Sequence, residues 1–254
     1  MFDVNAAHAA VRERAEASEA PAPPPDAAAC RACGVRHLTL CAPLAVHELQ
    51  TVARIARTHR LPAGSVLFNQ GDSAADLFTV TSGMVKTAKL LPDGRRQITG
   101  FLVPGDLVGL ADGGGYATTA EAVTDATLCG FERRALERAM TSHPELERHM
   151  LRLANNEVAA AHEQMMLLGR KTAREKIATF LVRFADRAAR RGASTSPLAL
   201  PMSRADLGDH LGLTMETVSR TFSRLRREGL IETANTHAVT LRDPAALRAL
   251  AEGG

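Results

Sequence analysis

Evenly spaced glycines divide the first half of this 254-residue chain into short hydrophobic runs. The runs at 65–68 and 77–81 are rich in β-branched and aromatic residues, which favour strands. The glycines recur every 7 to 12 residues: Gly64, Gly71, Gly83, Gly94 and Gly105. Because regular strands with glycine turns are typical of a β-barrel or jelly roll, we expect this architecture up to about residue 142.

Helical periodicity precedes and follows the glycine-rich region. Apolar residues from Leu44 to Ile55 predict a short helix between about 44 and 60. After Pro144, apolar residues alternate at spacings of three and four: Leu151, Ala154, Val158, Ala161, Met165 and Leu168. This seam suits a parallel partner helix, and its length favours a homodimer. The commoner use of such a stripe is packing against its own domain.

The last third of the chain predicts a helix-turn-helix. Residues 171–191 form an amphipathic helix and 194–201 a loop. Ser203 followed by Asp206 marks a helix start, Gly212 can take the left-handed stop conformation, and Thr214 can cap the next helix. Helix, short glycine turn and polar-faced helix form the DNA-binding pattern. Apolar runs at 229–231 and 238–241 then suggest a small β-wing.

The helix at 213–227 carries residue types that read base edges. Its apolar face holds Val218, Phe222 and Leu225. The opposite face and its flanks hold the candidate DNA-binding residues: Met215, Glu216, Ser219, Arg220, Ser223 and Arg224. Arg matches the two acceptors of guanine, Glu accepts from the amino group of cytosine, and Ser suits either. We interpret the chain as a sequence-specific DNA-binding regulator; the alternative is an ordinary amphipathic helix pair with solvated charges.

Charge is distributed unevenly along the chain. Residues 171–227 contain 12 Lys/Arg and 5 Asp/Glu, a balance of +7 in a chain of net charge +3. A positive reading domain favours contact with phosphates. Residues 1–29 are Ala- and Pro-rich and predict a flexible leader. No run is apolar enough for a membrane or export segment, so we expect a cytoplasmic protein in which structural disulfides are disfavoured.

Four cysteines therefore need another explanation. Cys30, Cys33 and Cys41 lie at the start of the expected ordered region, and Cys129 lies at the expected end of the barrel. Four thiolates can ligate a [4Fe–4S] cluster. They can also hold zinc, with His37 replacing one of them. In the simplest alternative, Cys129 is a buried apolar residue and the other three share no role.

These features together resemble the CRP/FNR family of bacterial transcription regulators. The resemblance runs from about Cys30 to the C-terminus, in an α+β order of β-barrel, long helix and winged helix-turn-helix. Four stretches are the most specific for the family. They are residues 71–83, which begin with Gly-Asp and end with Ser-Gly, residues 97–102, residues 104–109 (Pro-Gly-Asp-Leu-Val-Gly) and residues 213–220. The cysteine arrangement is similar to that of the oxygen-sensing FNR branch. The implied organisation is a leader at 1–29, a sensor domain at 30–142, a dimerisation helix at 143–170 and a DNA-binding domain at 171–254.

The resemblance implies a role for each set of residues. Cys30, Cys33, Cys41 and Cys129 match the positions that ligate an oxygen-labile [4Fe–4S] cluster. Glu216, Ser219 and Arg220 match the base-reading trio, which implies a palindrome of the TTGAT…ATCAA kind. The helix at 144–169 matches the dimerisation helix, and barrel loops such as the turn at 91–96 match surfaces that contact RNA polymerase. The implied function is oxygen-responsive transcription control, chiefly activation.

One residue departs from the family pattern. Ala161 occupies a seam position where oxygen-sensing relatives often carry an acid. Paired carboxylates at a two-fold seam repel each other, so alanine removes that repulsion. We therefore predict substantial dimer even without a cluster.

Three rival functions share the same fold. Cyclic-nucleotide binding needs a buried Arg, and the stretch Thr-Thr-Ala-Glu at 118–121 offers none. Haem would need a ligand such as His37 or His47, and a structural zinc would leave DNA binding constitutive. An enzyme is the weakest interpretation, because no nucleophile–base motif, Walker loop or dinucleotide fingerprint is present.

Overall fold

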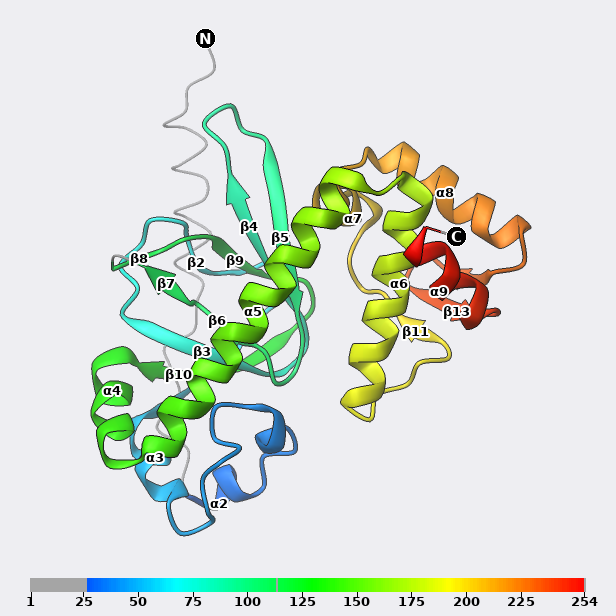
Figure 1. Cartoon of the computed structure of the whole chain (residues 1–254). Coiled ribbons are helices and arrows are strands. Elements are labelled where there is room, and N and C mark those ends of the chain that lie inside the picture. Colours follow the sequence, from blue (N-terminus) through cyan, green and yellow to red (C-terminus); the bar gives the residue numbers. More distant parts are fainter. Residues whose placement is uncertain (1–26, 113, 254) are drawn as a thin grey trace. The chain divides into compact units, whose positions relative to one another are not determined.

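The computed structural model describes residues 27–112 and 114–253 (Figure 1). The chain forms two compact units, divided between Asn155 and Asn156. Most of the expected leader, 1–26, lies outside the described residues, and its last three residues begin helix α2 (Ala27–Arg31). Among the described helices, none is long and apolar enough to cross a membrane.

The segment before the barrel contains less helix than expected. After α2 come a 3-10 turn, η1 (Arg36–Leu38), and helix α3 (Leu49–Ile55). The prediction of helix to about residue 60 was wrong, because strand β1 (Ala56–Leu61) begins directly after α3. Pairing of β1 with β10 (Ala126–Glu132), which is far away in sequence, overrides the local helical pattern.

The glycine-rich region folds into the expected barrel-like pair of antiparallel sheets. One sheet has the order β1-β10-β3-β6 and the other β2-β9-β4-β5, with a small β7-β8 pair beside them. The remaining strands are β2 (Val66–Phe68), β3 (Asp76–Ser82), β4 (Val85–Leu90), β5 (Arg96–Leu102), β6 (Leu107–Val108), β7 (Ala111–Asp112), β8 (Gly115–Tyr116) and β9 (Thr119–Ala122). All five spaced glycines have positive φ, as turns of this kind require.

Two apolar clusters form the core of the N-terminal unit. The first fills the barrel and includes Phe68, Val80 and Leu128. The second lies on the other face of β10 and includes Leu40, Leu49 and Phe131. The barrel was expected to continue to about residue 142, but residues Arg133–Ser142 form helix α4. This helix contributes Leu136 and Ala139 to the second cluster. The long helix α5 (Pro144–Arg170) follows and confirms the helix expected from Pro144 to Gly169.

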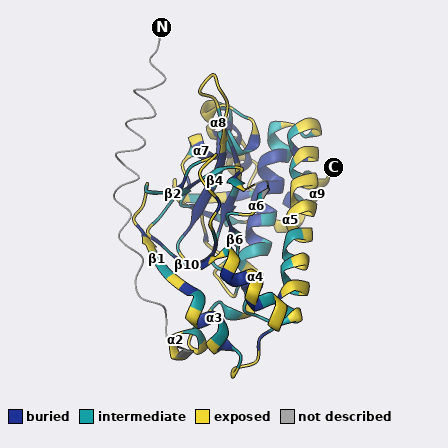
Figure 2. Cartoon of the chain, turned by 90° about the vertical axis from the view of Figure 1, so that its left-hand side faces the viewer, coloured by how far each residue is buried: buried dark blue, intermediate teal, exposed yellow. Residues whose placement is uncertain are grey.

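The C-terminal unit is the expected winged helix-turn-helix. It contains α6 (Ala173–Arg190), α7 (Arg204–Leu211), α8 (Met215–Arg227), β12 (Ile231–Asn235), β13 (Ala238–Leu241) and α9 (Pro244–Glu252). Helix α6 packs against α8 and α9. It is mostly buried, whereas α5 is largely exposed (Figure 2). The segment expected as a plain loop also contains β11 (Leu198–Ala199), which pairs with β13 and gives the wing a third strand.

Candidate DNA-binding surface and cysteine site

Helix α8 presents one apolar and one polar face. Val218, Phe222 and Leu225 are almost fully buried in the C-terminal unit. The six candidate DNA-binding residues are all exposed: Met215, Glu216, Ser219, Arg220, Ser223 and Arg224. The polar face is therefore open along the length of the helix.

Helix caps and a glycine turn fix how α7 presents α8. The hydroxyl of Ser203 accepts from Asp206 N at 3.0 Å, and Asp206 Oδ2 accepts from Ser203 N at 3.2 Å, which completes a capping box. Gly212 ends α7 with φ +61°. Thr214 Oγ1 then accepts from Thr217 N at 3.2 Å and starts α8. Each of these helix boundaries confirms the sequence prediction.

A cation–π contact also joins the two helices. The Arg204 guanidinium, in the first turn of α7, lies 3.5 Å from the centroid of the Phe222 ring on α8. Burial lowers the pKa of Arg204, yet guanidinium stays charged in proteins. Sequence reasoning missed this residue, because its partner lies eighteen positions away.

An arginine-rich groove runs beside the exposed face of α8. Ser219, Arg220, Arg224 and Arg227 line it from α8, and the first turn of α6 lines it from the other side. Glu228 pairs with Arg174 at 2.6 Å and with Arg224 at 2.9 Å, which holds these side chains in place. The groove therefore combines guanidinium groups with a helix N-terminus, an arrangement that suits phosphate oxygens.

Glu216 is held as a carboxylate at the start of α8. Hydrogen bonds from its own backbone and from the Thr214 side chain lower the pKa of Glu216. An ionised carboxylate is an acceptor only, as contact with the amino group of cytosine requires.

The seam of α5 contains large apolar side chains in contact with solvent. Leu151, Val158 and Met165 are 62 %, 55 % and 60 % exposed. Ala161 is exposed as well, whereas Ala154 and Leu168 are half-buried. Met166, which the seam spacing did not include, is 62 % exposed and widens the apolar face. A helix with this many exposed large side chains presents an interaction surface.

The fold brings the four cysteines together from separate elements. Cys30 lies on α2, Cys33 and Cys41 lie in the turns before α3, and Cys129 lies on β10. Leu128 points into the barrel core, so its neighbour Cys129 faces the second cluster, against which Cys30 and Cys41 also pack. Burial, followed by the charge of Cys30, raises the pKa of Cys41 to about 12. Burial and the other three thiols raise the pKa of Cys129 as well.

In the described part of the chain, the cysteine sulfurs do not form a preformed, closed zinc site. Tetrahedral zinc with bonds of about 2.3 Å places its four sulfurs roughly 3.8 Å apart. Among the described residues, no three cysteine sulfurs lie within 4.8 Å of one another. A cubane spreads its four ligands over four irons, so its sulfurs are farther apart than in a zinc site. His37, the alternative zinc ligand, is exposed on η1.

Two hydrogen bonds hold the cysteine-bearing loop, and sequence reasoning missed both. Arg36 Nη1 donates to Leu44 O at 3.0 Å. His149 Nε2, on the first half of α5, lies 3.0 Å from the carbonyl oxygen of Thr39. The loop that carries Cys41 is therefore tied directly to α5.

The barrel residue Glu121 has a partner of its own. Its Oε1 lies 3.0 Å from Lys86 Nζ on the neighbouring strand β4. In the stretch that corresponds to a cyclic-nucleotide site, this carboxylate therefore forms an ion pair within the protein.

Comparison with known proteins gives the same architecture. Residues 58–143 match the cyclic nucleotide-binding domain, and residues 175–250 match the Crp-like helix-turn-helix domain. The transcriptional activatory protein AadR of Rhodopseudomonas palustris is 41% identical over 219 residues, 86% of this chain and 91% of that protein. The chain belongs to the CRP/FNR family. It is a DNA-binding transcription regulator of the FNR branch, and not an enzyme.

Further relatives of this CRP/FNR regulator include nitrogen-fixation regulators. FixK of Bradyrhizobium diazoefficiens is 39% identical over 223 residues, which cover 87% of this chain and 93% of that protein. The solved structure of FixK2 from Bradyrhizobium japonicum superposes with a TM-score of 0.73 at 37% identity, over 77% of this chain and 97% of that one. The fold class expected from the sequence is thereby confirmed.

Proposed function

We propose that this regulator is an oxygen-responsive transcription activator, which binds an FNR-box-like palindrome as a homodimer under the control of a [4Fe–4S] cluster. The observation that carries the proposal is the position of Cys30, Cys41 and Cys129 against one apolar cluster, with Cys33 near enough to act on the Cys129 thiol. Relatives named as transcriptional activators support the direction of control.

The donor set fits an iron–sulfur cluster. The four thiols are partly buried, and burial together with the neighbouring thiols raises the pKa of Cys41 and of Cys129. A bound cluster would supply the oxygen-sensitive iron–sulfide bonds. The chain would supply the four thiolates, and the apolar surroundings would limit the access of water.

The cysteines hold a segment that reaches the dimerisation helix. Cys30, Cys33 and Cys41 would be fixed to Cys129, and the bond between His149 and Thr39 joins the same loop to α5. Any ligand shifts an equilibrium only by its differential affinity for the two states. The ordered loop must therefore favour the packing of α5 that pairs two copies along the apolar seam. Two reading helices then contact two half-sites.

Within each half-site, the polar face of α8 would read the bases. Arg220 would contact guanine, Glu216 would accept from cytosine, and Ser219 would assist. The groove arginines would contact phosphates. The exposed β4–β5 turn, with Leu90 and Leu91 at its surface, would face RNA polymerase.

Purification without air tests the proposal. We expect a brown protein with about four irons and four sulfides per chain, whose DNA affinity falls when air bleaches it. One zinc per chain, with DNA binding unchanged by air, would establish the zinc alternative instead. Colourless, metal-free protein that binds its operator as tightly as the anaerobic preparation would overturn the sensing mechanism.

A further inference from the structure

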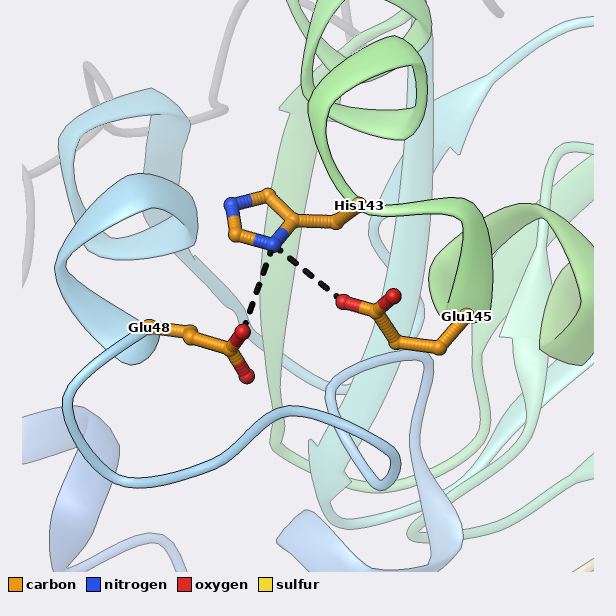
Figure 3. Close-up of side chains that lie close together, drawn as sticks. All are labelled: Glu48, His143 and Glu145. Atoms are coloured by element: carbon orange, nitrogen blue, oxygen red, sulfur yellow. Dashed lines mark hydrogen bonds and ion pairs between the residues drawn. The ribbon is translucent and has the colours of Figure 1, made fainter.

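A second cluster of metal-ligating side chains lies where α3, α4 and α5 meet in the N-terminal unit. His143 Nδ1 lies 3.2 Å from Glu145 Oε1 and 3.7 Å from Glu48 Oε1 (Figure 3). Their three ligand atoms all lie within 4.8 Å of one another. The imidazole and the Glu145 carboxylate, from one stretch of the chain, and the Glu48 carboxylate, from another, point toward one another (Figure 3).

We propose that Glu48, His143 and Glu145 form a binding site for a divalent first-row transition-metal cation, separate from the cysteines. Two ligand atoms that each lie about 2.1 Å from one ion are roughly 3.0–3.4 Å apart. The observed separations from Nδ1 are 3.2 and 3.7 Å, so the imidazole and each carboxylate are within a few tenths of an ångström of this spacing. The two carboxylates would balance the charge of the ion.

Contacts outside the trio orient two of the three ligands. The backbone N–H of Ala45 donates to Glu48 Oε2 at 2.7 Å, which leaves Oε1 directed at His143. His143 Nε2 lies 3.3 Å from Thr51 Oγ1 on α3. With Nε2–H donating to that hydroxyl, Nδ1 keeps its lone pair for an ion. A second ring nitrogen fixed in this way accompanies nearly all histidine ligands, because it sets the tautomer and the ring orientation.

The donor set indicates which class of cation binds. Imidazole suits zinc, iron and nickel, whereas carboxylates suit harder ions such as manganese. One nitrogen with two carboxylates therefore favours a borderline divalent ion over calcium or magnesium. The side chains of Glu48, His143 and Glu145 are 28 %, 17 % and 30 % exposed, so the ion is reached from solvent and keeps water on its open positions.

A bound ion would join three elements around the second apolar cluster. Glu48 is the N-cap residue of α3, His143 is the C-cap residue of α4, and Glu145 lies in the first turn of α5. The same cluster contains Leu49 and Leu146, which directly follow two of the ligands. Ion binding would thus stabilise the junction from which α5 begins.

Mn²⁺ titration of the full-length protein, followed by electron paramagnetic resonance of the free ion, tests the site. Mn²⁺ is the probe because thiolates select softer ions, so the cysteines do not compete. We expect one ion per chain, with the coupling of one imidazole nitrogen visible in pulsed spectra. Thr51→Val should weaken binding about 10- to 100-fold, and His143→Gln should abolish both binding and the nitrogen coupling.

Two exposed neighbours serve as matched controls. His47→Gln removes an imidazole next to Glu48, and Glu147→Gln removes a carboxylate from the same turn as Glu145. Both should bind Mn²⁺ like the unaltered protein. If the unaltered protein takes up no Mn²⁺ at millimolar concentration, or binds it without nitrogen coupling, the trio is an ion-paired cluster only. The pulsed spectra of the unaltered protein decide the question even if His143→Gln fails to fold.

Discussion

Gly208 lies against the backbone of Leu213, so close that a Cβ at residue 208 would lie 2.6 Å from the Leu213 carbonyl oxygen. Leu213 N also donates to Gly208 O at 3.0 Å, which closes the turn between α7 and α8. A glycine in a helix costs about 1 kcal/mol relative to alanine, and the sequence tolerates that cost here. The close approach is the physical reason.

Gly208→Ala should therefore destabilise the C-terminal unit, although alanine is the better helix former. Because the clash is with backbone, we expect a loss of about 1–3 kcal/mol in the free energy of unfolding. Urea denaturation followed by circular dichroism measures it. Gly169→Ala is the control, since a Cβ there meets nothing within 4 Å. A Gly208→Ala protein as stable as this control would show that the turn relaxes freely.

Arg220→Ala should relax base preference at one position of each half-site. The exposed guanidinium on the polar face of α8 would otherwise contact guanine, so we expect a loss of about 1–3 kcal/mol per half-site. Binding to a panel of single-base operator variants measures the preference. Arg226→Ala removes the same charge from the same helix outside the groove and should keep the preference. Unchanged base preference in Arg220→Ala would rule out direct reading by this residue.

Cys129→Ser should abolish cluster retention while preserving the fold. A serine hydroxyl is a poor substitute for a thiolate ligand of iron, and the other three cysteines would lose their partner on β10. Anaerobic iron and sulfide analysis measures the effect, and circular dichroism checks the barrel. Thr127→Ser, two residues earlier on β10, should load normally. A normal iron content in Cys129→Ser would leave Cys129 as an apolar core residue.

Ala161→Asp should convert a dimer into a monomer. The unaltered seam has no charge at residue 161, so we expect cluster-free protein to sediment largely as dimer at micromolar concentration. Two carboxylates facing each other across a two-fold axis repel and must be desolvated together. Ala160→Asp places the same charge one residue away, on an equally exposed position outside the seam, and should stay dimeric. If the unaltered protein, without a cluster, sediments only as a monomer, the prediction is wrong.

Acidification should weaken the N-terminal unit partly through His59. Its ring lies edge-on to Phe78, with centroids 5.2 Å apart, and burial lowers the pKa of His59 below its ordinary 6.5 despite the opposing charge of Asp76. As the pH falls, His59 in the unfolded chain therefore takes up a proton at a higher pH than His59 in the folded chain. The contribution of neutral His59 to the free energy of unfolding is fully present above about pH 6.5. It is lost as the pH falls through the lower pKa that His59 has in the folded chain.

His59→Gln should flatten this pH dependence. Urea midpoints at a series of pH values from about 7.5 to 5 measure the slope. His37→Gln, at an exposed site, should leave the slope as it is. A residual slope remains in the His59 variant because burial also lowers the pKa of His149. An equal slope in the His59→Gln and unaltered proteins would contradict the assignment.

Local sequence is enough to specify the individual helices, caps and turns. Caps at Ser203 and Thr214, the glycine turn at Gly212 and the two faces of α8 are set by neighbours within a few residues, so their pattern can be read directly. The alternate spacing along α5 and the glycine turns of the barrel are local in the same sense. These features were sufficient for the fold class.

Features that depend on contacts between residues far apart in sequence became visible only in the folded chain. Strand β1 forms in place of the last part of the expected helix because it pairs with β10. Strand β10 also carries Cys129, which faces the second apolar cluster together with Cys30 and Cys41. Glu48 meets His143 across almost a hundred residues, a proximity with no local sequence signal. Long-range contacts of this kind depend on which sheet face and which helix end the packed core presents, and neither is encoded within a short window of sequence.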